Sequence, residues 1–185
     1  MHLQFYTILQ LACLKSKQKK SVDLLLDVHG HQILANGIFN GDCHPGNILT
    51  LSNGKMGLID YGQCKRLGTD QSIAISNLTK ELGSSEANHE AIQGAMHQIG
   101  FRFKKNDELD NAQQMARLFF DSDCGSRAAG RTNPQEHYQQ LQKVNPFVVF
   151  PDEAVTIART FFLFQGMGSL LGTNIETAKR WSKIL

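Results

Sequence analysis

The sequence lacks the features that mark several common classes of protein. Its four cysteines are scattered and form no C-x-x-C pair, which argues against a zinc site and favours reduced thiols. No uninterrupted apolar run reaches the roughly eighteen residues that a membrane helix needs, and the first residues do not follow the charge order of a signal peptide. Basic and acidic side chains nearly balance, at 19 against 17. This balance gives no reason to expect nucleic acid or an anionic membrane as a partner.

The remaining composition is that of an ordinary folded protein. The chain has 185 residues, of which 41% are hydrophobic, and this is enough for one domain with a substantial core. It contains no internal repeat and no low-complexity tract. We therefore predict a single domain over residues 1–185.

Most of the chain carries patterns typical of helices. The predicted helices cover residues 3–14, 21–34, 70–82, 86–99, a segment starting at Asp107, 134–144, a long apolar segment starting at Pro151, and a last helix near the C-terminus. Ser21 is the predicted cap of the second helix and Gly37 its closing residue, and Thr69 is the predicted cap of the third. The capping box Thr173–Glu176 opens the last helix. Residues 15–20 are rich in lysine and are interpreted as a solvated linker. His29 and His31 project to different sides of a helix, so we expect surface or partly packed histidines rather than a metal pair.

Residues 48–59 are expected to form a β-hairpin. Two short apolar segments, 48–51 and 55–59, flank Asn53-Gly54, a pair that favours a tight hairpin turn. The predicted fold is therefore mainly α with a small β-hairpin. It is organised as a loop region over residues 37–67 and a helical subdomain over residues 69–185.

Polar groups that suit metal and phosphate chemistry flank this hairpin. Asp42 and Asn47 lie five residues apart in a turn-rich loop, and Asp60 follows the return strand. Phosphoryl transfer needs a group that orients the attacking hydroxyl and oxygen ligands for magnesium. An aspartate suits the first role, and an asparagine with a second aspartate suits the other. The sequence therefore predicts one site built from these three side chains.

The other residues of the two segments are expected to support the site. Pro45 and Gly46 favour a compact turn. His44 is either an acid or base or a hydrogen-bonding brace, and we favour the brace. Cys43 is either a modifiable thiol or a small filler, and we favour the filler, while Gly62 completes D-Y-G. Such residues also occur in ordinary surface turns, but their conjunction with the hairpin and D-Y-G favours a phosphotransferase-type site.

The segment GIFNGDCHPGNILTLSNGKMGLIDYGQCKRL resembles the core of the UbiB/ADCK atypical kinase family, protein-kinase-like proteins linked to coenzyme Q (ubiquinone) metabolism. That family shows D-x-H-P-G-N followed by D-[FY]-G. The resemblance implies a protein-kinase-like C-terminal lobe that uses Mg²⁺ and ATP. Asp42 is then the catalytic aspartate, and Asn47 and Asp60 bind the metal and, through it, the nucleotide. A weaker similarity extends over residues 151–172.

The chain also departs from the family pattern. No alanine-rich nucleotide loop, K-x-G-Q segment, or phosphate-binding lysine with its glutamate partner precedes Asp42. Asn40-Gly41 stand where the family usually has a histidine or its substitute before the aspartate. We therefore interpret the chain as a C-lobe fragment with the N-lobe absent. We expect the isolated chain to bind Mg-ATP weakly or not at all.

Two alternatives remain open. The chain could be a non-catalytic pseudokinase scaffold or binding module. It could also be a small-molecule kinase of the aminoglycoside or choline type, whose loop reads H-G-D-x-H-x-x-N, although D-Y-G-Q favours the UbiB/ADCK family. The resemblance implies lipid- or quinone-biosynthesis proteins or a membrane surface as partners. It also implies a mitochondrial or plastid location, whereas a chain complete as given would be cytoplasmic.

Overall fold

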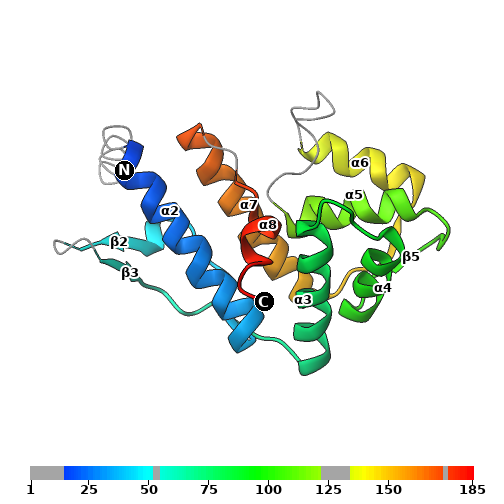
Figure 1. Ribbon diagram of the computed structural model, residues 1–185, viewed down its shortest axis with the longest axis horizontal. Coiled ribbons are helices and arrows are strands. Elements are labelled where there is room, and N and C mark those ends of the chain that lie inside the picture. Colours follow the sequence, from blue (N-terminus) through cyan, green and yellow to red (C-terminus); the bar gives the residue numbers. More distant parts are fainter. Residues whose placement is uncertain (1–14, 52–54, 122–133, 173–174) are drawn as a thin grey trace.

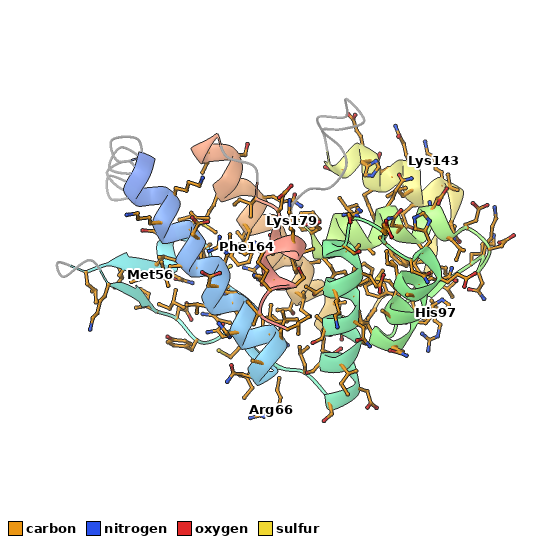
Figure 2. All side chains as sticks on the ribbon, in the orientation of Figure 1. Met56, Arg66, His97, Lys143, Phe164 and Lys179 are labelled. Atoms are coloured by element: carbon orange, nitrogen blue, oxygen red, sulfur yellow. The ribbon has the colours of Figure 1, made fainter. Side chains whose placement is uncertain are left out.

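The computed structural model describes residues 15–51, 55–121, 134–172 and 175–185, and it is mainly helical with small antiparallel sheets, as predicted. The helices form the body of the molecule, and a β-hairpin projects at one side (Figure 1). Met56 on this hairpin and His97 on a helix lie at opposite ends (Figure 2). The predicted helix over residues 3–14, the hairpin turn at Asn53-Gly54 and the predicted cap Thr173 lie outside the described residues.

The helices follow the order of the sequence prediction. They are α2 (Lys15–Gly30), which continues as a π-helical segment η1 (His31–Asn36), α3 (Thr69–Gly83), α4 (His89–Ile99), α5 (Leu109–Phe120), α6 (Pro134–Val144), α7 (Asp152–Leu171) and α8 (Thr177–Trp181). The bounds of α6 agree with the prediction. None of the helices in the described part of the chain is both long and apolar enough to cross a membrane.

The start of α2 corrects the sequence prediction. Lys15–Lys20 is helical rather than a linker, and Ser21 lies inside the helix rather than capping it. Lysine and glutamine are good helix formers, and the charges of Lys19 and Lys20 are exposed. The helix therefore keeps these two basic residues in solvent. The predicted end is confirmed, because Gly37 closes η1 in the left-handed region with φ of 63°.

Four other helix starts differ from the predicted ones by one to three residues. The cap of α3 is Gly68 rather than Thr69, and its amide donates to the Gln71 side chain at 3.1 Å. Helix α4 starts three residues later than predicted, because the Asn88 side chain accepts hydrogen bonds from the first-turn amides. Helix α5 begins two residues late, at Leu109. Pro151 caps α7 and lies just before its first residue.

Three antiparallel strand pairs accompany the helices in the described part of the chain. The predicted hairpin is confirmed as β2 (Ile48–Thr50) and β3 (Met56–Leu58), with Ile48 opposite Leu58. The sequence did not predict β1 (Ile38–Asn40) and β4 (Cys64–Arg66), which pair with Asn40 opposite Cys64. It also did not predict β5 (Arg102–Phe103) with β6 (Phe147–Val149). These strands have two or three residues each, too few for a recognisable alternation.

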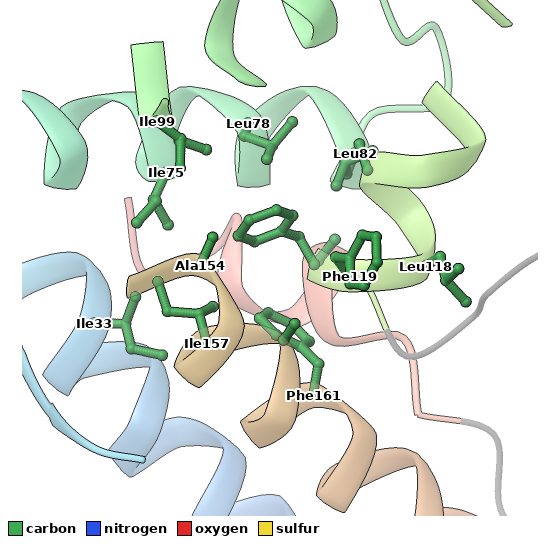
Figure 3. Close-up of a cluster of buried hydrophobic side chains, with 14 of the residues drawn as sticks. Ile33, Ile75, Leu78, Leu82, Ile99, Leu118, Phe119, Ala154, Ile157 and Phe161 are labelled. Carbon is green, nitrogen blue, oxygen red and sulfur yellow. The ribbon is translucent and has the colours of Figure 1, made fainter. Parts of the chain in front are cut away.

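The core lies between α3, α5 and α7. Side chains of α3 and α7 share one cluster, seen in Figure 3: Ile75, Leu78 and Leu82 from α3, and Ala154, Ile157 and Phe161 from α7. The spacing of three and four residues along each helix puts these side chains on one face. Helix α7 therefore has one face in the core, and residues on its other faces can contact the loop region 37–67.

His29 corrects a further prediction, because it is fully buried rather than at the surface or partly packed. Its ring lies edge-on to Phe164, with centroids 5.4 Å apart, and Nδ1 is 3.0 Å from the Leu25 carbonyl. Burial lowers the pKa of His29, which favours a neutral ring. His31 is exposed.

Helix α8 is short, and two interactions attach it to α2. Arg180 forms ion pairs with Asp23 at 2.9 Å and with Asp27 at 2.6 Å. The buried Trp181 donates its Nε1–H to the Leu26 carbonyl at 2.9 Å. A five-residue helix is not stable alone, so these contacts fix its position.

Replacing Arg180 with Gln is expected to loosen this attachment. The hydrogen bonds from Arg180 lower the pKa of Asp27 below its ordinary value of 3.8. Such a carboxyl contributes stability above its unfolded pKa, and the contribution is lost as the pH falls through the folded pKa. We expect Arg180→Gln to lower the free energy of unfolding by about 1 kcal/mol at neutral pH. The melting temperature of the variant should also fall less than that of the parent between about pH 6 and about pH 3.

Lys183→Gln is the matched control, because it removes an exposed positive charge of the same segment. In Lys183→Gln the melting temperature should depend on pH as it does in the parent. An equal pH dependence of the melting temperature in the parent and in Arg180→Gln would contradict the ion pair between Arg180 and Asp27.

Candidate functional site

Two strand pairs hold the predicted site loop. The segment 41–47 joins β1 to β2, and the segment 59–63 joins β3 to β4. Because β1 pairs with β4 and β2 pairs with β3, the two segments lie opposite each other. The amide of Ile59 donates to the Asn47 carbonyl at 3.0 Å, and that of Gly41 donates to the Gln63 carbonyl at 3.1 Å. The topology therefore brings Asp42, Asn47 and Asp60 to one region.

Asn40 joins the two segments through its side chain. It is 3% exposed. Its Nδ2 donates to the Asp60 carbonyl at 3.0 Å, and its Oδ1 accepts from the Asp42 amide at 2.9 Å. One carboxamide thus fixes the main chain at both predicted aspartates. The sequence analysis recorded Asn40 only as a departure from a family pattern, and its role depends on a contact across 20 residues.

Asn47 is held with its amide oxygen available. Its Nδ2 donates to the Asp42 carbonyl at 3.1 Å, which orients the side chain. No hydrogen bond to its Oδ1 occurs within the described residues. The residue is 8% exposed and ends the short 3₁₀ helix η2 (Pro45–Asn47). The oxygen of Asn47 is therefore free to accept a ligand.

Asp60 has a strained backbone. With φ of 61° it is the one non-glycine residue at positive φ in the described part of the chain. Such conformations occur preferentially at functional sites. Its Oδ1 accepts from the Gly62 amide at 3.1 Å, so the second carboxylate oxygen remains available. Gly62 suits this contact, because an added Cβ would lie 3.2 Å from the same oxygen.

Asp42 makes an ion pair that the sequence analysis missed. Arg159 on α7 donates from Nη2 to Asp42 Oδ1 at 2.9 Å. The Arg159 side chain is 54% exposed and that of Asp42 is 16% exposed. The sequence signal is a single arginine within the apolar segment 147–171. Its partner lies 117 residues away, so the sequence alone could not identify the pair.

Helix α7 also approaches the loop at Gly41. A Cβ on this residue would overlap the Thr156 methyl carbon Cγ2 and would lie 3.1 Å from the Gln63 carbonyl. Glycine is therefore required by packing rather than by a special φ. One turn of α7, containing Thr156 and Arg159, forms the wall behind the loop.

The supporting loop residues have structural contacts. His44 Nδ1 accepts from the Gly46 amide at 2.9 Å and caps η2, which agrees with the predicted brace. Pro45 occupies the first turn of η2. An added Cβ at Gly46 would lie 2.5 Å from the His44 ring. Cys43 is buried, and burial raises the pKa of its thiol to about 12. A protonated, buried thiol fits the filler role rather than that of a reactive group.

The available oxygens suit magnesium. Asn47 Oδ1 and the free oxygen of Asp60 are hard ligands, and magnesium usually takes one or two protein carboxylates and keeps several waters. No cluster of three or more His, Cys, Asp or Glu side chains that could hold a metal occurs in the described residues. A site with one carboxylate and one amide fits magnesium better than zinc.

The order of these elements defines a class of protein. An aspartate, an asparagine five residues later, a hairpin and an Asp-x-Gly segment follow each other as in the catalytic and metal-binding loops of protein kinases. Residues 4–93 match the family model of the ABC1 atypical kinase-like domain. This match covers just under half of the chain, and it confirms the resemblance to UbiB/ADCK-type atypical kinases.

A curated relative shares a short stretch of sequence. An uncharacterized protein of Synechocystis sp. is 41% identical over 51 residues, which are 28% of this chain and 12% of that protein. The match therefore spans about an eighth of the relative's length. The activity, substrates and partners of a whole protein of this kind remain proposals for this chain.

Gly41→Ala is expected to destabilise the protein, because the new methyl group would overlap Thr156. We expect a loss of about 1–3 kcal/mol in the free energy of unfolding, as for other overpacked sites. Unfolding by denaturant measures this loss of stability. Thr156→Ser removes the overlapping Cγ2, so the double variant should regain part of this loss.

Gly94→Ala is the matched control. Gly94 lies inside α4, with nothing within 4 Å of an added Cβ. This change should stabilise the helix by up to about 1 kcal/mol. If Gly41→Ala lowers the free energy of unfolding no more than Gly94→Ala does, α7 does not approach the loop as closely as described.

Proposed function

We propose that Asp42, Asn47 and Asp60 form the acceptor- and metal-binding half of an Mg-ATP-dependent phosphoryl-transfer site. The observation that carries the proposal is the double hydrogen bond of Asn40. It fixes the main chain at Asp42 and Asp60, while one oxygen each of Asn47 and Asp60 remains available. Preorganised oxygen ligands of this kind are what phosphoryl transfer requires of the protein.

Each residue has a separate role in this proposal. Asn47 Oδ1 and the Asp60 carboxylate would hold the magnesium ion. Bound magnesium would neutralise charge on the phosphate oxygens of ATP. Asp42 orients the attacking hydroxyl or water and accepts its proton. For this, Asp42 must release Arg159 or share its carboxylate with it, since one of its oxygens is bonded to that guanidinium.

The wider role is inferred from the family resemblance. We propose that a complete protein carrying this domain supports ubiquinone biosynthesis or lipid homeostasis, with lipid- or quinone-biosynthesis proteins or a membrane surface as partners and a mitochondrial or plastid location. The family match favours this inference over a small-molecule kinase of the aminoglycoside or choline type. We expect the 185-residue chain alone to bind Mg-ATP weakly and to turn it over negligibly, because its residues 1–41 contain no K-x-G-Q segment.

A second candidate function is a non-catalytic pseudokinase scaffold. The observation that favours it is the ion pair between Asp42 and Arg159, which occupies one oxygen of the carboxylate needed for the nucleophile. The two candidates differ at the metal ligands. A scaffold does not require metal at Asn47 and Asp60, whereas a phosphoryl-transfer site does.

Mn²⁺, a paramagnetic substitute for magnesium, tests the metal site in the purified chain. We expect titration with Mn²⁺ to broaden the amide NMR signals of Asn47, Tyr61 and Gly62 before others, with weak, saturable binding. Asp60→Asn removes a charged ligand and should lower the affinity at least about tenfold. Asp70→Asn is the matched control, because Asp70 is exposed in the first turn of α3. Broadening that is unchanged in Asp60→Asn would exclude the proposed ligand set.

A further inference from the structure

An apolar cavity lies beside the wall that α7 forms behind the loop. Its volume is about 340 Å³, within the range of about 300–1,000 Å³ of small-molecule sites. The lining residues in the described part of the chain come from α5, α7 and the segment before α7: Phe119, Phe150, Val155, Ala158, Arg159, Phe162 and Leu163. Val155 and Phe162 are exposed, so the cavity opens to solvent. Apart from Arg159, every one of these residues is apolar.

Arg159 belongs both to this cavity and to the functional loop. Arg159 is one of the lining residues, and its guanidinium bonds to Asp42. Arginine commonly lays its methylene stem along apolar surface while its charge remains in solvent. More than half of the side chain is exposed. Among the described lining residues, the cavity therefore has an apolar wall and one positively charged residue, Arg159.

We propose that this cavity binds an anionic amphiphile, a molecule with one hydrocarbon chain and a carboxylate or phosphate end. The chain packs against Phe119, Phe162 and Leu163, and the anionic end bonds to the Arg159 guanidinium. A neutral or cationic amphiphile would bury the same hydrocarbon without this charge-assisted hydrogen bond. The positive charge of Arg159 therefore favours a ligand with a negative charge.

The anionic end competes with Asp42 for the same guanidinium. Arg159 Nη2 bonds to Asp42 Oδ1 in the structure, and the negative charge of Asp42 repels a second anion. Occupation of the cavity therefore weakens the Asp42–Arg159 pair, and removal of the Asp42 charge strengthens ligand binding by the same coupling. The consequence for activity rests on the proposed function, but the binding itself does not depend on it.

Calorimetric titration with decanoate and with decanol, which share one chain length, tests the proposal. We expect decanoate to bind with one-to-one stoichiometry and about tenfold more tightly than decanol. Arg159→Gln should weaken decanoate binding about tenfold and leave decanol binding unchanged. Asp42→Asn should strengthen decanoate binding several-fold. Phe162→Asp should weaken the binding of both ligands.

Arg66→Gln is the matched control for loss of a positive charge, because Arg66 is exposed on β4 (Figure 2) and does not line the cavity. It should bind both ligands as the parent does. Circular dichroism should show that each variant is folded. Absence of saturable decanoate binding, or equal decanoate affinity in the parent and Arg159→Gln, would overturn the proposal. A dimer that Phe162→Asp abolishes, without decanoate binding, would instead assign the cavity to contact between copies of the chain.

Discussion

The geometry of the candidate site depends on the side chain of one residue, Asn40. Its carboxamide donates to the Asp60 carbonyl and accepts from the Asp42 amide, so it connects two segments that are separated by a hairpin. The residue is buried, and a buried polar group left without a partner costs about 1–3 kcal/mol. Both bonds are therefore strongly favoured, and the positions of the two aspartates are coupled.

The strands and η1 hold Asn40 in its place. Asn40 ends β1, which pairs with β4, and its amide donates to the Gln32 side chain of η1 at 3.4 Å. Gly37 turns the chain from η1 into β1 through its left-handed conformation. The helical body thus determines where the strand ends, and the strand end determines where the carboxamide lies.

Helix α7 connects the site with the rest of the molecule. Its inner face packs in the core with α3. Thr156 leaves no room for a side chain at Gly41, and Arg159 pairs with Asp42. The same arginine lines the apolar cavity. A ligand in the cavity and the carboxylate of Asp42 therefore act on one guanidinium, which gives the two regions a direct physical coupling.

Local chemistry made part of this arrangement predictable from the sequence. The Asn53-Gly54 turn signal with its flanking apolar segments predicted β2 and β3, and the loop motifs identified Asp42, Asn47 and Asp60. The helical segments were predictable from their period and from closing glycines such as Gly37. These features depend on residues close together along the chain.

The remaining features depend on contacts between distant residues or on competing local groups. The pairing of β1 with β4 and the role of Asn40 require residues that are 20 to 28 positions apart to meet. The Asp42–Arg159 pair spans 117 residues. His29 was expected near the surface but is enclosed by α2 and Phe164. The basic segment at residues 15–20 was mistaken for a linker, because its charge was weighed above its helix propensity.

Hydrogen exchange at the Asp42 amide tests the central claim most directly. If Asn40 holds the loop as described, this amide exchanges slowly in the parent chain and becomes fast in Asn40→Ala, while Asn77→Ala, a change at an exposed position of α3, leaves its exchange slow. Fast exchange of the Asp42 amide in the parent, or equal exchange in the parent and Asn40→Ala, would contradict the account.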